Sequence, residues 1–441
     1  PSASSVLAPA RASPQRVVAP APRGPRRAIF RLPSMLPPRP RSRPLGGAAA
    51  LLLLAVLHRP AGPGGSSALS GRQTFAAAGG QRCRQPAQRG PLRIRRWESG
   101  GGALPATAPP ELRADNGEER RRLRELLERH RADDGEAWAS LALTGLLWLT
   151  AVAALHVSGG HWAAVVFLAL NMVRCFIVFH DAAHSSFFED AASNKRLAQV
   201  LQFFVNYSYE EWDSIHNSHH AHFGDVTVKD ASLTVFFSEA EVAQAPWHLR
   251  WAHRLIRDPL LFFPLAGFFV FLVNKPLIHG PCRAVLPLLL WLALGPQTAL
   301  AYMAAAWLAG SLGVAAFHLQ HHCNRPYRVE DAAARSALDA AMLGSTRIPL
   351  PFPLSTFSFG IEYHHIHHFD VRVPGYRLPR CDAEGEKLGL WRRVNTVGMV
   401  RAFKSLFHTQ FEGSTRAAER GGTQPRFVSF WPYSALGLQD A

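Results

Sequence analysis

Histidine is concentrated in four short clusters in the second half of the chain. The clusters read His180-Asp-Ala-Ala-His184, His216-Asn-Ser-His219-His220, His318-Leu-Gln-His321-His322 and His364-His365-Ile-His367-His368, and with His222 they hold 13 of the 21 histidines. Residues three and four apart share one face of a helix, so each cluster aims two or three imidazoles at one point. Because one zinc ion takes about four ligands, this number of imidazoles predicts two metal ions.

A metal ligand must be deprotonated and must point toward the ion, and neutral imidazole meets the first condition near pH 7. His321 is taken as the ligand from its cluster, with His322 as the rival. His365 lies off the face that its neighbours define and is not counted among the ligands. His222 is assigned to a supporting or surface position. The predicted ligands are His180, His184, His216, His219, His220, His321, His364, His367 and His368.

Ligand type alone leaves several metals open, because imidazole suits zinc, copper, iron and nickel. Zinc cannot change its redox state, so oxygen chemistry would need another metal. Ligating histidines usually donate their second N–H to a carboxylate or a carbonyl. Asp181, Asp225, Glu362 and Asp370 stand beside the clusters, and Glu362, two residues before His364, is the preferred candidate.

The positive charge of the chain lies near its N-terminus. Residues 1–100 hold 17 arginines and one acidic residue, Glu98, whereas the remainder carries 31 basic and 31 acidic residues. A basic folded domain, which nucleic-acid binding would need, is therefore not indicated. Met35 is a candidate initiator, residues 46–57 resemble a signal-peptide core, and residues 63–97 have transit-peptide composition. This pattern favours a plastid membrane over the endoplasmic reticulum; the alternative is a basic tail or translated leader sequence.

Five apolar runs indicate a membrane protein. They cover residues 137–155, 162–179, 259–273, 284–294 and 297–317. The first two approach the ~20 residues that a bilayer core needs and form an antiparallel hairpin. Gly295-Pro296 breaks the helix between the last two runs. The clusters on either side of residues 259–317 must meet on one membrane face, so we predict two crossings there, with one run re-entrant or lying in the interface.

The loop of residues 185–257 carries basic residues, which the positive-inside rule places on the cytosol-like side; in a plastid this is the stroma. We therefore predict an all-α, multi-pass membrane protein with about four transmembrane helices and a histidine-lined di-metal site in a cap on one membrane face. A disordered histidine-rich tract is not indicated, because the clusters adjoin apolar helices. A metal transporter is a weaker alternative. Transport would need ionisable residues inside the spans, and Arg174 is the main one there.

The histidine boxes and their surroundings resemble those of membrane fatty-acid desaturases. The segments FHDAAHSSFF, HNSHHAHFGD and GIEYHHIHHFDVRVPGYRLP are similar to the acyl-lipid branch that introduces omega-6-type double bonds, as are Leu319-Gln320-His321 and RFVSFWPY near the C-terminus. The resemblance covers residues 137–433 and supports His321. Residues 318–322 hold more histidines than the family typically shows at this point.

The resemblance implies a non-haem site with two iron ions that uses dioxygen and two electrons to form a cis double bond in an acyl-lipid substrate within the bilayer. No catalytic residue beyond the metal ligands is implied. No His-Pro-Gly-Gly motif of a fused haem domain occurs, so we expect a separate electron donor, ferredoxin or a cytochrome b-type protein. Carotenoid ketolases or hydroxylases and alkane hydroxylases of the same histidine-box type are the alternatives. The expected organisation is a targeting region at 1–100, a charged surface helix or linker at 101–136, the membrane desaturase domain at 137–433 and a tail at 434–441.

Overall fold

The structure, a computed structural model, describes residues 117–225, 228, 239–274, 284–323, 327, 329, 335–412, 426–429 and 433–436. The chain divides into two units, residues 1–91 and 92–441, and every described residue belongs to the second. The predicted targeting segments at 46–57 and 63–97 lie outside the described residues.

Helices dominate the described part of the chain. They are α2 (Gly117–Arg129), α3 (Asp134–Val157), α4 (Trp162–Ala183), α5 (Ala191–Val205), α6 (Tyr209–His222), α7 (Glu239–Gln244), α8 (Trp247–Arg257), α9 (Pro259–Gly267), the π-helix η2 (Phe268–Asn274), α11 (Val285–Leu294), α12 (Pro296–His321), α13 (Ala337–Gly344), α14 (Leu354–Ser358), α15 (His364–Phe369), α16 (Leu378–Lys387), α17 (Met399–Ser405) and the 3-10 helix η5 (Tyr433–Leu436). Two small sheets pair the strands β1 (Thr346–Arg347) with β2 (Asn395–Thr396) and β3 (Gln410–Glu412) with β4 (Arg426–Val428).

Among the described residues, three helices, α3, α4 and α12, are long and apolar enough to cross a membrane. A fourth candidate arises if α8 and the α9–η2 segment, which meet at 74°, are counted as one span. The prediction of a multi-pass helical membrane protein with about four spans is therefore confirmed. The helix α4 continues four residues beyond the predicted end of its apolar run, to Ala183, so His180 lies in its last turn.

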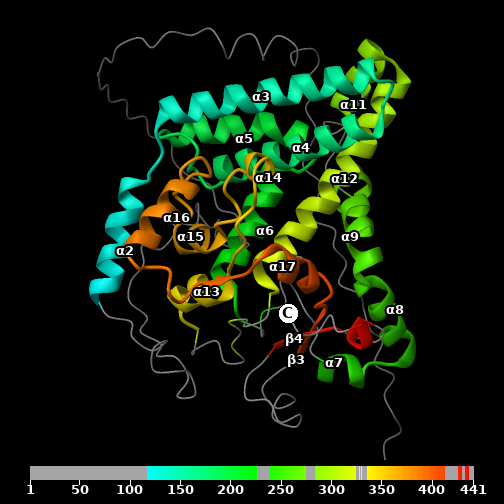
Figure 1. Cartoon of the computed structure of the whole chain (residues 1–441). Helices are drawn as coiled ribbons and strands as arrows, with labels where there is room; N and C mark the ends of the chain where they lie inside the picture. The colour runs from blue at the N-terminus through cyan, green and yellow to red at the C-terminus, as the bar shows by residue number, and fades with distance from the viewer. Residues whose placement is uncertain are drawn as a thin grey trace, which may run out of the picture. The chain divides into compact units, whose positions relative to one another are not determined.

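The helix α4 packs against α3, α5 and α12, which lie around it in Figure 1. The helix α9 lies beside α12 in the opposite direction. Phe263 makes an edge-on contact with His318, with ring centroids 5.4 Å apart, and Phe271 of η2 lies against Gly310, about two turns earlier in α12. Two antiparallel helices return the chain to the side that it left, as the two predicted crossings require. Gly295, at φ 88°, separates α11 from α12, and this left-handed conformation favours glycine.

The crossing of α9 over α12 depends on Gly267. A Cβ atom at this position would lie 2.3 Å from Ser311 Oγ and 2.5 Å from the Ser311 backbone nitrogen. We expect Gly267→Ala to push the two helices apart and to lower the free energy of unfolding by roughly 1–3 kcal/mol, as overpacking does. Thermal unfolding of the detergent-solubilised protein measures this loss. Gly313→Ala in α12 is the control, because a Cβ there meets nothing within 4 Å; equal melting temperatures for the two variants would contradict the prediction.

The helix α2, part of the segment predicted as a charged surface helix, has one buried face. Leu123, Leu126 and Leu127 are almost fully buried in a core that includes Cys381 of α16 and Trp391. Its charged side chains remain outside, where Arg121 pairs with Glu118 and Glu125 of the same helix. The apolar stripe of α2 therefore joins it to the cap that contains α13, α15 and α16.

The segment before α16 holds the cap against the start of α3. The Tyr376 hydroxyl donates to the carbonyl of Phe187 at 2.9 Å, and the Arg377 guanidinium bonds Glu136 at 2.9 Å. Asp133 caps α3 by accepting a bond from the Glu136 backbone nitrogen at 2.9 Å. These contacts fix the chain that follows α15 and so help to orient the histidines of that helix.

Candidate metal centre

The predicted ligands come from four elements that packing brings together. His180 lies in the last turn of α4 and His184 caps its C-terminus. The helix α6, capped by Ser208, carries three of the predicted ligands on its last two turns, α12 ends with His321, and the short helix α15 carries the remaining three predicted ligands. All nine side chains are buried or half-buried. The structure therefore brings all nine predicted residues into one region.

Five of these imidazoles form the first histidine group. It consists of His180, His184, His216, His220 and His367, whose ring nitrogens lie within 4.8 Å of one another. The Nε2 atoms of His180 and His216 are 3.0 Å apart, those of His216 and His220 3.1 Å, and those of His220 and His367 3.1 Å. Their Nε2 atoms thus converge on one small volume.

The second histidine group contains His219, His321 and His368, whose ring nitrogens also lie within 4.8 Å of one another. His219 Nε2 is 3.2 Å from His321 Nε2 and 3.3 Å from His368 Nε2. His364 adjoins this group, since its Nε2 is 3.0 Å from His321 Nε2 and its ring centroid 4.6 Å from that of His368. The two groups are neighbours, because the rings of His220 and His368 are 4.4 Å apart.

The donor set fits metal ions. Metal–imidazole bonds of about 2.0–2.1 Å bring neighbouring ligand nitrogens to about 3 Å when the bonds lie near right angles, which is the spacing observed. His184 Nε2 is buried and has no hydrogen-bond partner among the described residues, as expected for a lone pair kept for an ion. Burial lowers the pKa well below 6.5 for His184, His216, His220, His364, His367 and His368. These imidazoles are therefore neutral at physiological pH and their lone pairs are available.

Three histidines of the clusters lie elsewhere. His318 Nε2 bonds the carbonyl of Ser405 at 3.0 Å, and His322 stacks on His318 and packs on Phe427. Among the three histidines at the end of α12, the structure brings only His321 to the groups. His365 is fully buried against Trp391, and its Nε2 is 3.5 Å from Asp382 Oδ1.

One carboxylate supports the first group directly. Asp181 Oδ1 lies 3.1 Å from Nδ1 of His180, and its Oδ2 accepts a bond from the Gly375 backbone nitrogen at 2.6 Å. A carboxylate that receives the Nδ1–H of a histidine fixes the tautomer with a free Nε2 lone pair. Asp181 therefore connects α4 to the chain after α15 and orients His180.

The preference for Glu362 as this supporting carboxylate is wrong. Its Oε2 accepts a hydrogen bond from Ser358 at 2.6 Å, within its own turn, and burial raises its pKa. Asp370 pairs with Arg131 and Arg372 instead. Proximity in sequence was not sufficient, because the Glu362 carboxylate bonds the hydroxyl of Ser358, four residues earlier in the chain.

Aromatic side chains enclose the groups, and the histidine pattern did not indicate them. Trp212 stacks on His216 with centroids 4.5 Å apart, one turn earlier in α6. Phe223 lies 4.2 Å from the ring of His321, and Phe317 lies 5.1 Å from that of His219. The i,i+4 spacing of Trp212 and His216 was the available signal. Such an apolar shell limits the access of water to a metal site.

The location of His365 leads to a prediction. We expect His365→Ala to leave the metal content unchanged but to lower the free energy of unfolding by roughly 1–3 kcal/mol, because it empties a buried position beside Trp391. His364→Ala, its neighbour on α15, should lose metal instead. Metal analysis and thermal unfolding of both purified variants separate these effects. Equal metal loss in the two variants would show that the assignment of faces on α15 is wrong.

The described fold and the two histidine groups define a helical membrane protein with a candidate metal centre. The family model "Fatty acid desaturase" matches residues 159–390, which is more than half of the chain and includes all nine predicted ligands. The chain belongs to the fatty acid desaturase family, as its motifs predicted, and is thus an oxidoreductase of fatty-acid metabolism.

Two relatives show how far the similarity extends. A fatty acid desaturase of Bacillus subtilis is 28% identical over 276 residues, which cover 59% of this chain and 77% of the relative. An sn-1 oleoyl-lipid 12-desaturase of Synechocystis sp. is 25% identical over 262 residues, which cover 55% of this chain and 74% of that protein.

Proposed function

We propose that this protein is an acyl-lipid desaturase that introduces an omega-6-type cis double bond at a site with two iron ions, using dioxygen and two electrons. One observation carries the proposal: nine imidazoles from four separate elements converge in two adjacent groups. The first group of five and the second group, counted with His364, would each hold one ion. The omega-6 assignment rests on the motifs and on the relative named for position 12 of an oleoyl lipid.

Each part of the chain has a definite role in this proposal. Bound iron would supply the redox chemistry of oxygen activation. The neutral imidazoles would hold the ions, Asp181 orients His180, and Trp212, Phe223 and Phe317 limit the access of water. No further acid or base is required.

The acyl chain is proposed to lie against an aromatic wall beside the first group. Trp212 contacts Phe176 of α4 at 4.9 Å and Tyr207 at 5.3 Å between ring centroids, and Tyr207 contacts Phe271 of η2 at 5.8 Å. These rings continue from His216 toward the apolar helices and offer an alkyl chain favourable contact. A chain held at one depth presents one pair of carbons to the metal site, so the position of the double bond follows from placement.

The remaining partners are proposed from the sequence. Two electrons would come from a separate donor, ferredoxin in a plastid membrane or a cytochrome b-type protein in the endoplasmic reticulum, and the N-terminal composition favours the plastid. Both named relatives are desaturases, so oxygen insertion by a ketolase or hydroxylase is not favoured.

Expression of the chain in yeast together with an electron donor tests the proposal. Fatty acids are analysed by mass spectrometry with localisation of double bonds, and iron is measured in the purified protein. We expect a new diene and about two iron atoms per chain, since one ion takes about four ligands. A hydroxylated product, or an unchanged profile from inserted, iron-loaded protein with a working donor, would overturn the proposal.

A further inference from the structure

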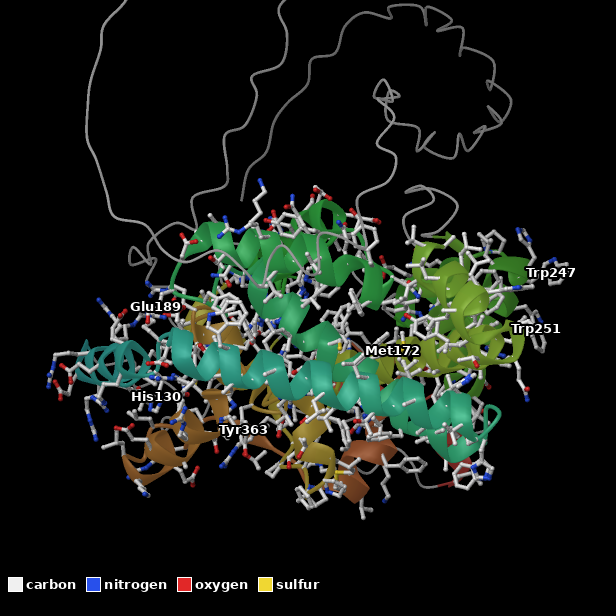
Figure 2. The ribbon with its side chains drawn as sticks, turned by 90° about the horizontal axis from the view of Figure 1, so that it is seen from above. His130, Met172, Glu189, Trp247, Trp251 and Tyr363 are labelled. Atoms are coloured by element: carbon white, nitrogen blue, oxygen red, sulfur yellow. The ribbon has the colours of Figure 1, made fainter. Side chains whose placement is uncertain are left out.

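The helix α8 exposes an apolar surface of unusual extent for so short an element. None of its residues is buried. Its large apolar side chains are between 53% and 68% exposed: Trp247, Leu249, Trp251, Leu255 and Ile256. In Figure 2, Trp247 and Trp251 project outward at the edge of the molecule. Water is a poor environment for this surface, which needs an apolar partner.

The polar residues of α8 lie mainly on the side opposite its apolar residues. At 3.6 residues per turn, Trp251, Leu255 and Ile256 lie on one side of the helix. Arg250 and Arg257 lie opposite them, Arg254 lies at the border beside Trp247, and α8 contains no acidic residue. Apolar and aromatic residues opposite arginines are the pattern of a helix that lies in a membrane interface.

The orientation of α8 agrees with this pattern. The helix meets α9 at 74°, while α9 runs along the candidate span α12. Asp258 holds the bend, because its Oδ1 accepts a bond from the Leu260 backbone nitrogen at 2.9 Å and its Oδ2 one from the Tyr433 hydroxyl at 2.8 Å. With α12 crossing the bilayer, α8 lies close to the membrane plane.

A second apolar surface lies at the same end of α12. Phe403 and Val400 of α17 are at least 60% exposed. A chain of ring contacts connects this surface to the α8–α9 bend: Phe403 lies 5.9 Å from Phe407, and Phe407 lies 4.9 Å from Tyr433, which bonds Asp258. This second apolar surface is therefore linked through Phe407 and Tyr433 to the bend between α8 and α9.

We propose that α8 lies in the headgroup region of the bilayer, with Trp251, Leu255 and Ile256 in the acyl boundary and Arg250 and Arg254 on anionic lipid headgroups. Tryptophan favours this depth because its ring is amphipathic, and arginine extends from it to reach phosphate. Because α8 continues into α9, and α9 packs on the helix that carries His321, this anchor sets the depth of the histidine groups relative to the acyl chains.

Spin-label accessibility tests the proposal without reference to activity. Single cysteines carrying a nitroxide are placed at positions 247 to 257 in the full chain, with its native cysteines replaced by alanine, and reconstituted in bilayers with anionic phospholipid. Contact with oxygen should be greatest at 251 and 255, at about 5–10 Å depth, and contact with a water-soluble nickel complex greatest at 250 and 257. Labels at Leu300 of α12 and Glu125 of α2 serve as the lipid and water references.

Two patterns would overturn this assignment. Uniformly high oxygen contact would show that α8 is part of a bent membrane span. Uniformly low oxygen contact would show that α8 faces water or a protein partner.

A lipid comparison tests the arginines. With the label at 251, removing anionic lipid should move the label toward water, and the double variant Arg250→Gln/Arg254→Gln should lose this dependence, whereas Arg124→Gln on α2 should retain it. A label depth in the original chain that does not change with lipid charge would contradict the proposed contact of the arginines with anionic headgroups.

Discussion

Replacement of His216 by alanine should abolish desaturation and remove metal from the protein. His216 Nε2 lies 3.0 Å from that of His180 and 3.1 Å from that of His220, so its loss removes a central member of the first group. The loss of activity should exceed the roughly 10–100-fold that follows from changing an outer partner of a ligand. Iron content of the purified variant and double-bond analysis of the lipids measure the two effects together.

His222→Ala is the matched control, because His222 lies on the same helix but is exposed. We expect wild-type metal content and a free energy of unfolding within about 0.5 kcal/mol of the original. Full metal content in the His216 variant, or equal losses in both variants, would contradict the proposed ligand set.

Asp181→Ala should lower desaturase activity and metal affinity by roughly 10–100-fold without abolishing them. The substitution removes the partner of His180 Nδ1 and also leaves the Gly375 backbone N–H without its acceptor. The second loss costs about 1–3 kcal/mol of stability. Asp181→Asn keeps one carbonyl oxygen and should fall between the original and the alanine variant. Metal titration separates the effect on the site from the loss of stability that thermal unfolding records.

Glu362→Gln is the comparison for Asp181, because sequence proximity favoured Glu362 for the same role. Its carboxylate bonds Ser358 in the structure, so we expect unchanged metal affinity. A larger loss of metal affinity in the Glu362 variant than in the Asp181 variant would show that Glu362 is the carboxylate that supports the ligands.

Several features of this protein follow from its sequence alone. Helical spacing indicated that ligand histidines within one helix share a side, apolar runs indicated the spans, and Gly295-Pro296 marked the break before α12. These are local properties, because helix periodicity and the length of an apolar run depend on residues within one element. The motifs around the clusters also indicated the family that residues 159–390 match.

The division of the histidines into two groups needed the tertiary structure. His219 and His220 are adjacent on α6, yet the first meets His321 of α12 and the second meets His367 of α15. Asp181, rather than Glu362, reaches a predicted ligand because the chain after α15 returns to α4 and presents the Gly375 N–H there. Periodicity determines which side chains share a face of a helix, but the partner of that face depends on packing between segments far apart in the chain.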